Sequence, residues 1–344
     1  MTSIAIFKFT HPLENKEQLW AIGDTRITAI SEDASKSKSN ESITSGAKIF
    51  SIPVRVSRLS EKEGEDSFLL KSSVGMAYAG NTTLGLNLYA QLSQILPNLV
   101  ADDFADAPIV SLLDIVKFAT NVLEQMAREM NQRYRIWSQI QTAEIAIFGS
   151  CPADQMLRVY TIFPKLEKQE FGFRYEENAP TDALSAHLSS QTGCVLLGDK
   201  KKEITELIRA RREDLLAPGV MFKEVKTEVA MTPKYVLEAL IHHNVFPTIG
   251  RGLQVLIADD SGIHPHIWGR PQSTSVPAGE YEMYSLYNFN VMETIPDIGK
   301  TRIIYWPCIG PDYDVDVTGF DLLCEFQQEL RRLMGKPPDL FYYA

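Results

Sequence analysis

The stretch Met1-Thr2-Ser3-Ile4-Ala5-Ile6-Phe7-Lys8-Phe9 opens the chain, and Trp20-Ala21-Ile22-Gly23-Asp24-Thr25-Arg26 follows it after a polar turn. Both stretches carry the apolar residues typical of strands, so together they predict a hairpin. A hydroxyl residue, Thr2, follows the initiator methionine and leads straight into the first strand. Removal of Met1 would make Thr2 an N-terminal nucleophile, and this possibility decides how the rest of the chain is interpreted.

The composition is that of a globular protein. The 344 residues are 44% apolar, which is enough for a proper core. Acidic residues outnumber basic ones by 44 to 34, for a net charge of −10, which argues against nucleic acid as a partner because phosphate binding needs a basic surface. No uninterrupted apolar run approaches the roughly 20 residues that span a bilayer, and the N-terminus has no basic-then-apolar signal region. We therefore expect a cytoplasmic protein without a membrane partner.

The cysteines indicate neither a metal site nor a disulfide framework. They lie far apart and have none of the close spacings of metal-ligand pairs: Cys151, Cys194, Cys308 and Cys324. Such cysteines are typical of reduced, buried thiols in the cytoplasm. We expect no metal and no cofactor.

The order of predicted elements favours an α+β fold. Strands are expected at 3–9, 19–30, 46–52, 67–79, 144–149, 156–163, 194–198 and 252–258. Helices are expected at 82–96, 112–130, 201–216, 232–243 and 320–334, the fourth with Thr232 as its N-cap and Pro233 in its first position. Each pair of helices in the first 270 residues lies between strand-forming runs. This order predicts a four-layer αββα sandwich, in which two antiparallel sheets pack face to face and helices cover both outer sides.

The composition changes near residue 271. From there the chain is rich in Tyr, Pro and Asp. We expect residues 1–270 to form the main domain, with 271–344 as an extension that packs on the same domain or on a neighbouring subunit.

Several segments, in order, resemble proteasome β-type subunits and their bacterial relatives in the N-terminal nucleophile hydrolase superfamily, which has the four-layer αββα fold. The similarity covers residues 2–268, with insertions. The matching segments are Thr2-Ser3-Ile4-Ala5-Ile6-Phe7-Lys8, Gly23-Asp24-Thr25-Arg26, Ala47-Lys48-Ile49-Phe50, the strand that ends at Gly80, the hairpin over 146–160, and residues 231–257.

The resemblance implies a role for four residues. A threonine hydroxyl holds its proton at neutral pH, so it needs a base and a stabiliser of the developing oxyanion. By resemblance, Thr2 is the nucleophile and Lys48 helps to withdraw its proton. Asp24 pairs with Lys48, and the backbone N–H of Gly80 faces the oxyanion.

The resemblance also implies supporting and substrate-binding residues. Arg26 belongs to the Asp-x-Arg segment, and the family's Gly-Ser pair matches Gly198 and Asp199. The family's Asp-x-x-Ser-Gly run falls on residues 243–250, where Asn244 and Thr248 are candidate substitutes and the expected aspartate is missing. Three further residues match positions that line the main specificity pocket, which a tyrosine would narrow: Ile27, Tyr78 and Thr82.

These observations predict a threonine-type peptidase. After removal of Met1 it would hydrolyse peptide bonds in peptide or protein substrates through a Thr2 acyl-enzyme. By resemblance we expect a homo-oligomer with a ring or ring-like arrangement. An ATPase or activator partner is a further possibility by resemblance. The last residues, Tyr342-Tyr343-Ala344, resemble the tails by which proteasome activators dock, but we favour packing of this tail on its own domain or on a neighbour.

Two alternatives stay open. The first is a catalytically inactive structural or regulatory subunit, which the missing aspartate and the long C-terminal extension favour. The second is an amidase or acylase that acts on a small molecule, since the superfamily includes such enzymes.

Overall fold

The computed structural model of the chain describes most residues between Ser3 and Pro271 and a few short segments beyond them. The described residues are 3–11, 15–28, 41–43, 46–58, 68–101, 110–134, 140, 142–167, 170–181, 183, 192–217, 225–243, 245–246, 248–250, 252–271, 281–286, 289–290, 308–309 and 332–333. Thr2 and Asn244 lie outside them.

The strands form two large sheets and one small one. In the first sheet the order is β11 (Cys194–Gly198), β1 (Ser3–Thr10), β2 (Glu17–Asp24), β12 (Leu253–Asp259), β13 (Gly262–Pro271), β14 (Tyr281–Leu286) and β15 (Phe289–Asn290), and β16 (Cys308–Ile309) also pairs with β13. In the second sheet the order is β10 (Glu170–Glu177), β9 (Leu157–Glu167), β8 (Glu144–Ser150), β6 (Phe68–Ala79), β5 (Ile49–Arg58) and β7 (Leu99–Ala101). The short strands β3 (Ile27–Thr28) and β4 (Glu41–Ile43) pair with each other.

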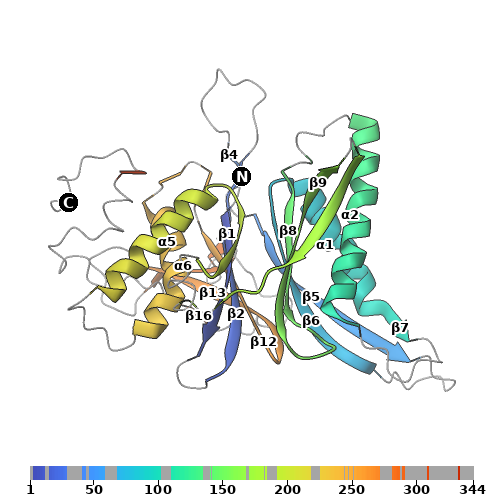
Figure 1. Cartoon of the computed structure of the whole chain (residues 1–344), viewed down its shortest axis with the longest axis horizontal. Coiled ribbons are helices and arrows are strands. Elements are labelled where there is room, and N and C mark those ends of the chain that lie inside the picture. The colour runs from blue at the N-terminus through green and yellow to red at the C-terminus, as the bar shows by residue number, and fades with distance from the viewer. Residues whose placement is uncertain are drawn as a thin grey trace.

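Helices lie on the outer side of each large sheet (Figure 1). Figure 1 shows α5 (Lys201–Leu216) and α6 (Val225–His242) beside the first sheet, and α1 (Thr82–Ile95) and α2 (Leu112–Tyr134) beside the second. A short 3₁₀ helix, Leu96–Asn98, follows α1. This mixed arrangement confirms the predicted α+β class; its identification with the four-layer αββα sandwich stays a prediction.

Three buried clusters explain why the central strands are apolar on both faces. Along β1, Ala5 and Phe7 pack in the cluster that contains residues of α5 and α6, whereas Ile4 and Ile6 pack in a cluster with residues of the second sheet. The third cluster joins β5 and β6 to α1 and α2. A strand covered on both faces has a continuous apolar run, as Ile4-Ala5-Ile6-Phe7 does in β1.

Helix α6 begins earlier than the sequence predicts. It starts at Val225, so Thr232 and Pro233 lie inside it, and the Thr232 hydroxyl donates to the Glu228 carbonyl instead of capping the helix. A proline has no N–H for the carbonyl four residues earlier. Here that carbonyl, on Val229, accepts Nε of the buried Arg212 at 3.3 Å, which explains how the helix accommodates the proline.

Three further segments bear on the predicted elements: residues 170–177, the helix expected at 320–334 and the predicted division of the chain at residue 270. The sequence pattern predicted no strand at residues 170–177, but β10 forms the edge of the second sheet there. A carboxylate oxygen of Glu124 accepts the Phe173 N–H at 3.1 Å. Of the helix expected at 320–334, only Arg332 and Leu333 are described, and both are helical. The division of the chain at residue 270 stays a prediction, although β14 to β16 continue the first sheet.

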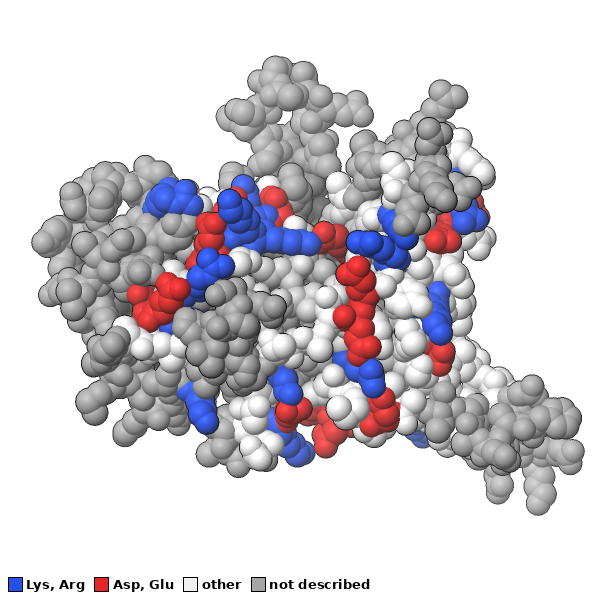
Figure 2. All heavy atoms as spheres, viewed as in Figure 1, with Lys and Arg blue, Asp and Glu red and all other residues white. Residues whose placement is uncertain are grey.

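Basic and acidic side chains are interspersed on the face drawn in Figure 2. An ion pair also joins the two sheets at the surface, where Lys201 Nζ at the start of α5 lies 2.7 Å from Glu144 Oε1 at the start of β8. Within the described residues, no helix has the length and hydrophobicity needed to cross a membrane.

Candidate functional site

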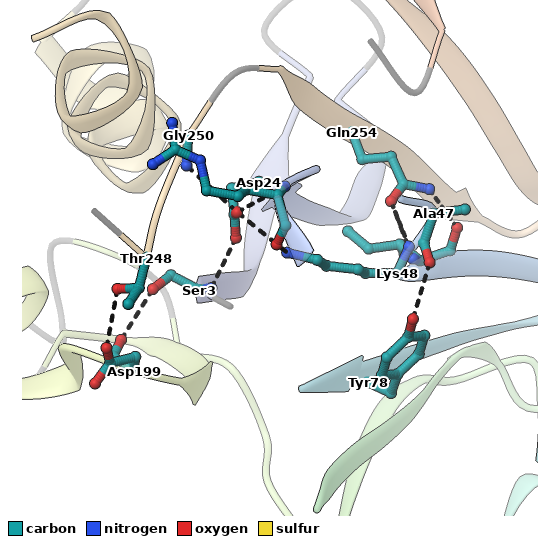
Figure 3. Close-up of polar contacts among 11 residues, drawn as sticks. Ser3, Asp24, Ala47, Lys48, Tyr78, Asp199, Thr248, Gly250 and Gln254 are labelled. Atoms are coloured by element: carbon teal, nitrogen blue, oxygen red, sulfur yellow. Dashed lines mark hydrogen bonds and ion pairs between the residues drawn. The ribbon is translucent and has the colours of Figure 1, made fainter. Parts of the chain in front are cut away.

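Asp24, the last residue of β2, is the centre of a buried polar cluster (Figure 3). Its side chain is 0% exposed. The carboxylate accepts four donors: the backbone N–H of Ser3 at 2.9 Å, that of Arg26 at 3.0 Å, Lys48 Nζ at 3.1 Å and the backbone N–H of Gly250 at 3.4 Å. One carboxylate therefore ties the start of β1 to the lysine at the start of β5.

Lys48 lies directly before β5 and is 1% exposed. Its Nζ donates to Asp24 and to the backbone carbonyl of Arg26. Burial lowers the pKa of Lys48 below its ordinary value because the charged amine loses its hydration, and the charge of Asp24 opposes this effect only in part. An amine of this kind gives up its proton more readily than a surface lysine does.

The turn after β11 holds a second carboxylate near Ser3. The Ser3 hydroxyl donates to the backbone carbonyl of Asp199 at 2.9 Å, and the Thr248 hydroxyl donates to Oδ2 of Asp199 at 3.0 Å (Figure 3). Gly198 and Lys200, on either side, both have positive φ angles, of 90° and 60°. Residues 243–250 contain no aspartate, as the sequence shows, but Asp199 brings a carboxylate to Thr248 from a different segment.

Gly80 follows β6 and precedes α1. Its φ of +83° is one that side-chain-bearing residues rarely adopt, and a Cβ at this position would lie 1.8 Å from the backbone oxygen of Thr142. The amide oxygen of Asn81 caps α1 by accepting the N–H of Leu84 at 3.0 Å. Local backbone geometry thus requires a glycine at position 80, independently of any substrate.

The residues expected to line a specificity pocket are only partly described. Tyr78 is 2% exposed, its ring stacks on Phe50, and its hydroxyl donates to the carbonyl of Ala47 at 3.2 Å. Burial raises the pKa of Tyr78 to about 12, and an interaction with Thr82 opposes that rise. The backbone of Ile27 pairs with that of Ile43, and its side chain lies outside the described residues.

Gln254, on β12, is a site residue that the sequence analysis missed. Its amide binds the backbone at Lys48 and Ile49 and is 2% exposed (Figure 3). A polar residue inside the apolar strand Leu-Gln-Val-Leu-Ile-Ala-Asp was the available signal. Among the described residues, no group of three or more His, Cys, Asp or Glu side chains could hold a metal ion.

The structure brings together most of the polar residues predicted for the site. Asp24, Lys48 and Ser3 share one set of contacts, and Asp199 and Thr248 join it through Ser3. A buried lysine with a lowered pKa, held by a carboxylate that also accepts the backbone N–H of Ser3, has the chemistry of a proton acceptor.

Comparison with known proteins gives a weak likeness. No family model and no curated protein matches the chain. Among solved structures, the chain is similar to Anbu from Hyphomicrobium sp. strain MC1, with 14% identity and a TM-score of 0.38, over 77% of this chain and 87% of that one. It is also similar to Anbu (ancestral beta-subunit) from Yersinia bercovieri, with 14% identity and a TM-score of 0.37, over 77% of this chain and 86% of that one.

These findings correct the resemblance stated from the sequence. The assignment of the chain to the relatives of proteasome β-type subunits is wrong, because the two solved structures named above are Anbu proteins, which are proteasome-related but distinct. At this identity and TM-score the likeness carries no argument about activity. Any functional conclusion rests on the site itself.

Proposed function

We propose that the chain is a threonine-type peptidase whose nucleophile is the Thr2 hydroxyl, freed at the N-terminus by removal of Met1. One observation carries the proposal: the buried Lys48 shares the Asp24 carboxylate with the backbone N–H of Ser3. That N–H belongs to the peptide bond that joins Thr2 to Ser3. The carboxylate that holds the candidate base therefore also binds the backbone N–H of Ser3, the residue that follows the candidate nucleophile in the sequence.

The proposed reaction uses these groups in two steps. In the first, the Thr2 oxygen attacks the carbonyl carbon of a peptide bond while its proton passes to Lys48, which Asp24 holds in place. The leaving amine takes this proton from Lys48 as the carbon–nitrogen bond breaks, and the acyl group remains on Thr2 as an ester. In the second, water attacks the ester and gives a proton to Lys48. The bond between the acyl group and Thr2 then breaks, the acyl group leaves as a carboxylic acid, and the Thr2 oxygen takes its proton back from Lys48.

Two features near Gly80 support its proposed role in binding the oxyanion. Gly80 immediately precedes the Asn81 cap of α1, and the first turn of that helix contains no acidic residue. The positive end of the helix dipole is thus not neutralised by the helix itself, and it favours negative charge nearby.

The proposal is tested by covalent labelling. Full-length protein is first shown by intact mass to lack Met1 and is then treated with a β-lactone, which acylates nucleophilic hydroxyls. We expect one adduct on Thr2, no adduct with Thr2→Ala, and a normal adduct with the control Thr10→Ala, which alters an exposed threonine of the same strand. An absence of adduct on protein without Met1 contradicts the proposal, and full retention of Met1 favours a structural or regulatory protein instead.

Assembly stays part of the proposal. We also propose a homo-oligomer with a ring or ring-like arrangement, as expected from the sequence. Sedimentation of the labelled protein tests this, and a purely monomeric active species contradicts it. An ATPase or activator partner, the cytoplasmic location and the substrate preference stay predictions.

A further inference from the structure

Gln254 joins the two large sheets beside Lys48 (Figure 3). Its Oε1 accepts the backbone N–H of Lys48 at 2.8 Å and that of Ile49 at 3.2 Å, while its Nε2 donates to the carbonyl of Ile49 at 2.6 Å. The side chain is 2% exposed. One buried amide thus makes three hydrogen bonds to two consecutive residues of another sheet.

The position of Gln254 relates these bonds to Asp24. On β12, Leu253 lies opposite Asp24 and Gln254 lies opposite Gly23, so both belong to the same part of the first sheet. Gly23 leaves room for the side chains of Ile4 and Ile49, because a Cβ at position 23 would lie 2.9 Å from the first and 3.3 Å from the second. The strand next to Asp24 therefore also holds the backbone of Lys48.

Among the described residues, no strand of the second sheet pairs with the N–H of Lys48, which Gln254 accepts. Strand β5 pairs with β6 along its length, and the Lys48 carbonyl accepts the N–H of Tyr78 at 3.0 Å. On the other side, β7 pairs only with Val56 to Arg58 among the described residues. Buried backbone N–H groups need acceptors, and Gln254 supplies one where a strand is lacking.

We propose that Gln254 is a positioning residue that sets the location of the Lys48 amine relative to Asp24 and to the Thr2 hydroxyl. The proposal rests on the proposed function, since it concerns how Lys48 reaches the proton of Thr2. Asp24 and Lys48 lie on different sheets, and their pairing depends on how the sheets are held against each other. A displacement of about 1 Å in a catalytic group can reduce a rate about 100-fold.

The test compares three variants of the full chain, each shown to lack Met1. Gln254→Met removes all three hydrogen bonds at similar volume, and Gln254→Glu keeps the two accepted bonds. The matched control is Gln18→Met, which removes a half-buried amide of β2 that accepts Trp20 Nε1 at 3.1 Å, away from the site. The readout is the rate of Thr2 acylation by a β-lactone across a pH series, followed by intact mass.

We expect Gln254→Met to slow acylation about 10- to 100-fold, Gln254→Glu to slow it less, and Gln18→Met to leave it within about twofold. We also expect the pH at which the rate levels off to move upward in Gln254→Met, because a released lysine regains hydration. A residue that only stabilises the fold would lower the unfolding temperature without moving that pH.

The outcomes separate this proposal from the proposed function. If the unmodified protein forms no Thr2 adduct, the proposed function fails and the role of Gln254 in catalysis fails with it. If it forms the adduct and Gln254→Met behaves like Gln18→Met, only the positioning role is overturned. Should Gln254→Met not fold, Gln254→Glu decides the question by the same two readouts, and an unchanged rate and pH profile overturn the proposal.

Discussion

The Nζ atom of Lys48 lies 3.1 Å from Oδ2 of Asp24, and the two side chains are 1% and 0% exposed. Asp24 ends a strand of the first sheet, and Lys48 precedes a strand of the second, so the ion pair crosses the interface between the sheets. Removing two such charges from water costs several kcal/mol per ion, which their attraction only partly repays. Stability alone is therefore a poor reason for this pair, whereas the proposed proton transfer from Thr2 would use it.

Removal of the Asp24 charge should destabilise the fold. In Asp24→Asn the buried Lys48 amine loses its counter-charge, so we expect the free energy of unfolding to fall by about 3 to 5 kcal/mol at neutral pH, measured by urea titration. The double variant with Lys48→Met should recover part of this loss, because the uncompensated charge is gone. The control is Glu17→Gln, which breaks an exposed pair with Lys8 and should cost at most about 1 kcal/mol. Equal losses in the single and double variants contradict the prediction.

Alkaline pH should destabilise the protein through Tyr78. Its folded-state pKa is about 12, against an ordinary value of 10.0, so the folded state keeps a proton that the unfolded state has lost. The unfolding free energy therefore falls as pH rises from 10 to 12, by about 2 to 3 kcal/mol from this residue. Tyr78→Phe should lack this share of the slope and lose about 1 kcal/mol at neutral pH with its hydrogen bond to Ala47. The control is Tyr175→Phe, at a tyrosine that is 37% exposed, and an identical alkaline slope in all three proteins overturns the prediction.

A side chain at position 80 should be poorly tolerated. In Gly80→Ala the new Cβ meets the backbone oxygen of Thr142 at 1.8 Å and the φ of +83° is strained, so we expect a loss of at least about 2 kcal/mol in unfolding free energy. The comparison is Gly172→Ala, where the nearest atom is the end of the flexible Glu124 side chain at 2.9 Å. A smaller loss at position 80 than at position 172 would show that the backbone adjusts there.

Local patterns predicted the elements whose signals are local. The amphipathic period of residues 201–216 predicted α5 with its observed bounds, and the apolar run at the N-terminus predicted β1. The predicted start of α6 was wrong, because a proline such as Pro233 is a strong signal for the first turn of a helix. Its accommodation inside the helix depends on Arg212, which comes from another helix and leaves no trace near position 233.

Some residues of the candidate site were predicted from the sequence and others were missed. Composition and spacing placed Asp24 and Lys48 on separate strands, and only the family resemblance suggested that they meet. That resemblance was itself assigned to the wrong group. Gln254 was missed because a single amide in a strand matches no motif, and its three bonds appear only when the two sheets are packed together. Contacts between sheets are what the sequence pattern cannot show.

If Lys48 is the proton acceptor, the rate of Thr2 acylation should depend on pH. Because burial lowers its folded-state pKa below 10.5, the neutral amine becomes populated as pH rises through that lowered value. The rate should therefore rise with pH and level off below 10.5. An arginine keeps its proton at all accessible pH values, so Lys48→Arg should lose about 100- to 10,000-fold in rate while retaining the positive charge beside Asp24. The control Lys8→Arg changes a lysine of β1 that pairs with Glu17 and should react normally. A rate that levels off only at or above 10.5, or a Lys48→Arg variant that reacts as fast as the unmodified protein, excludes Lys48 as the base.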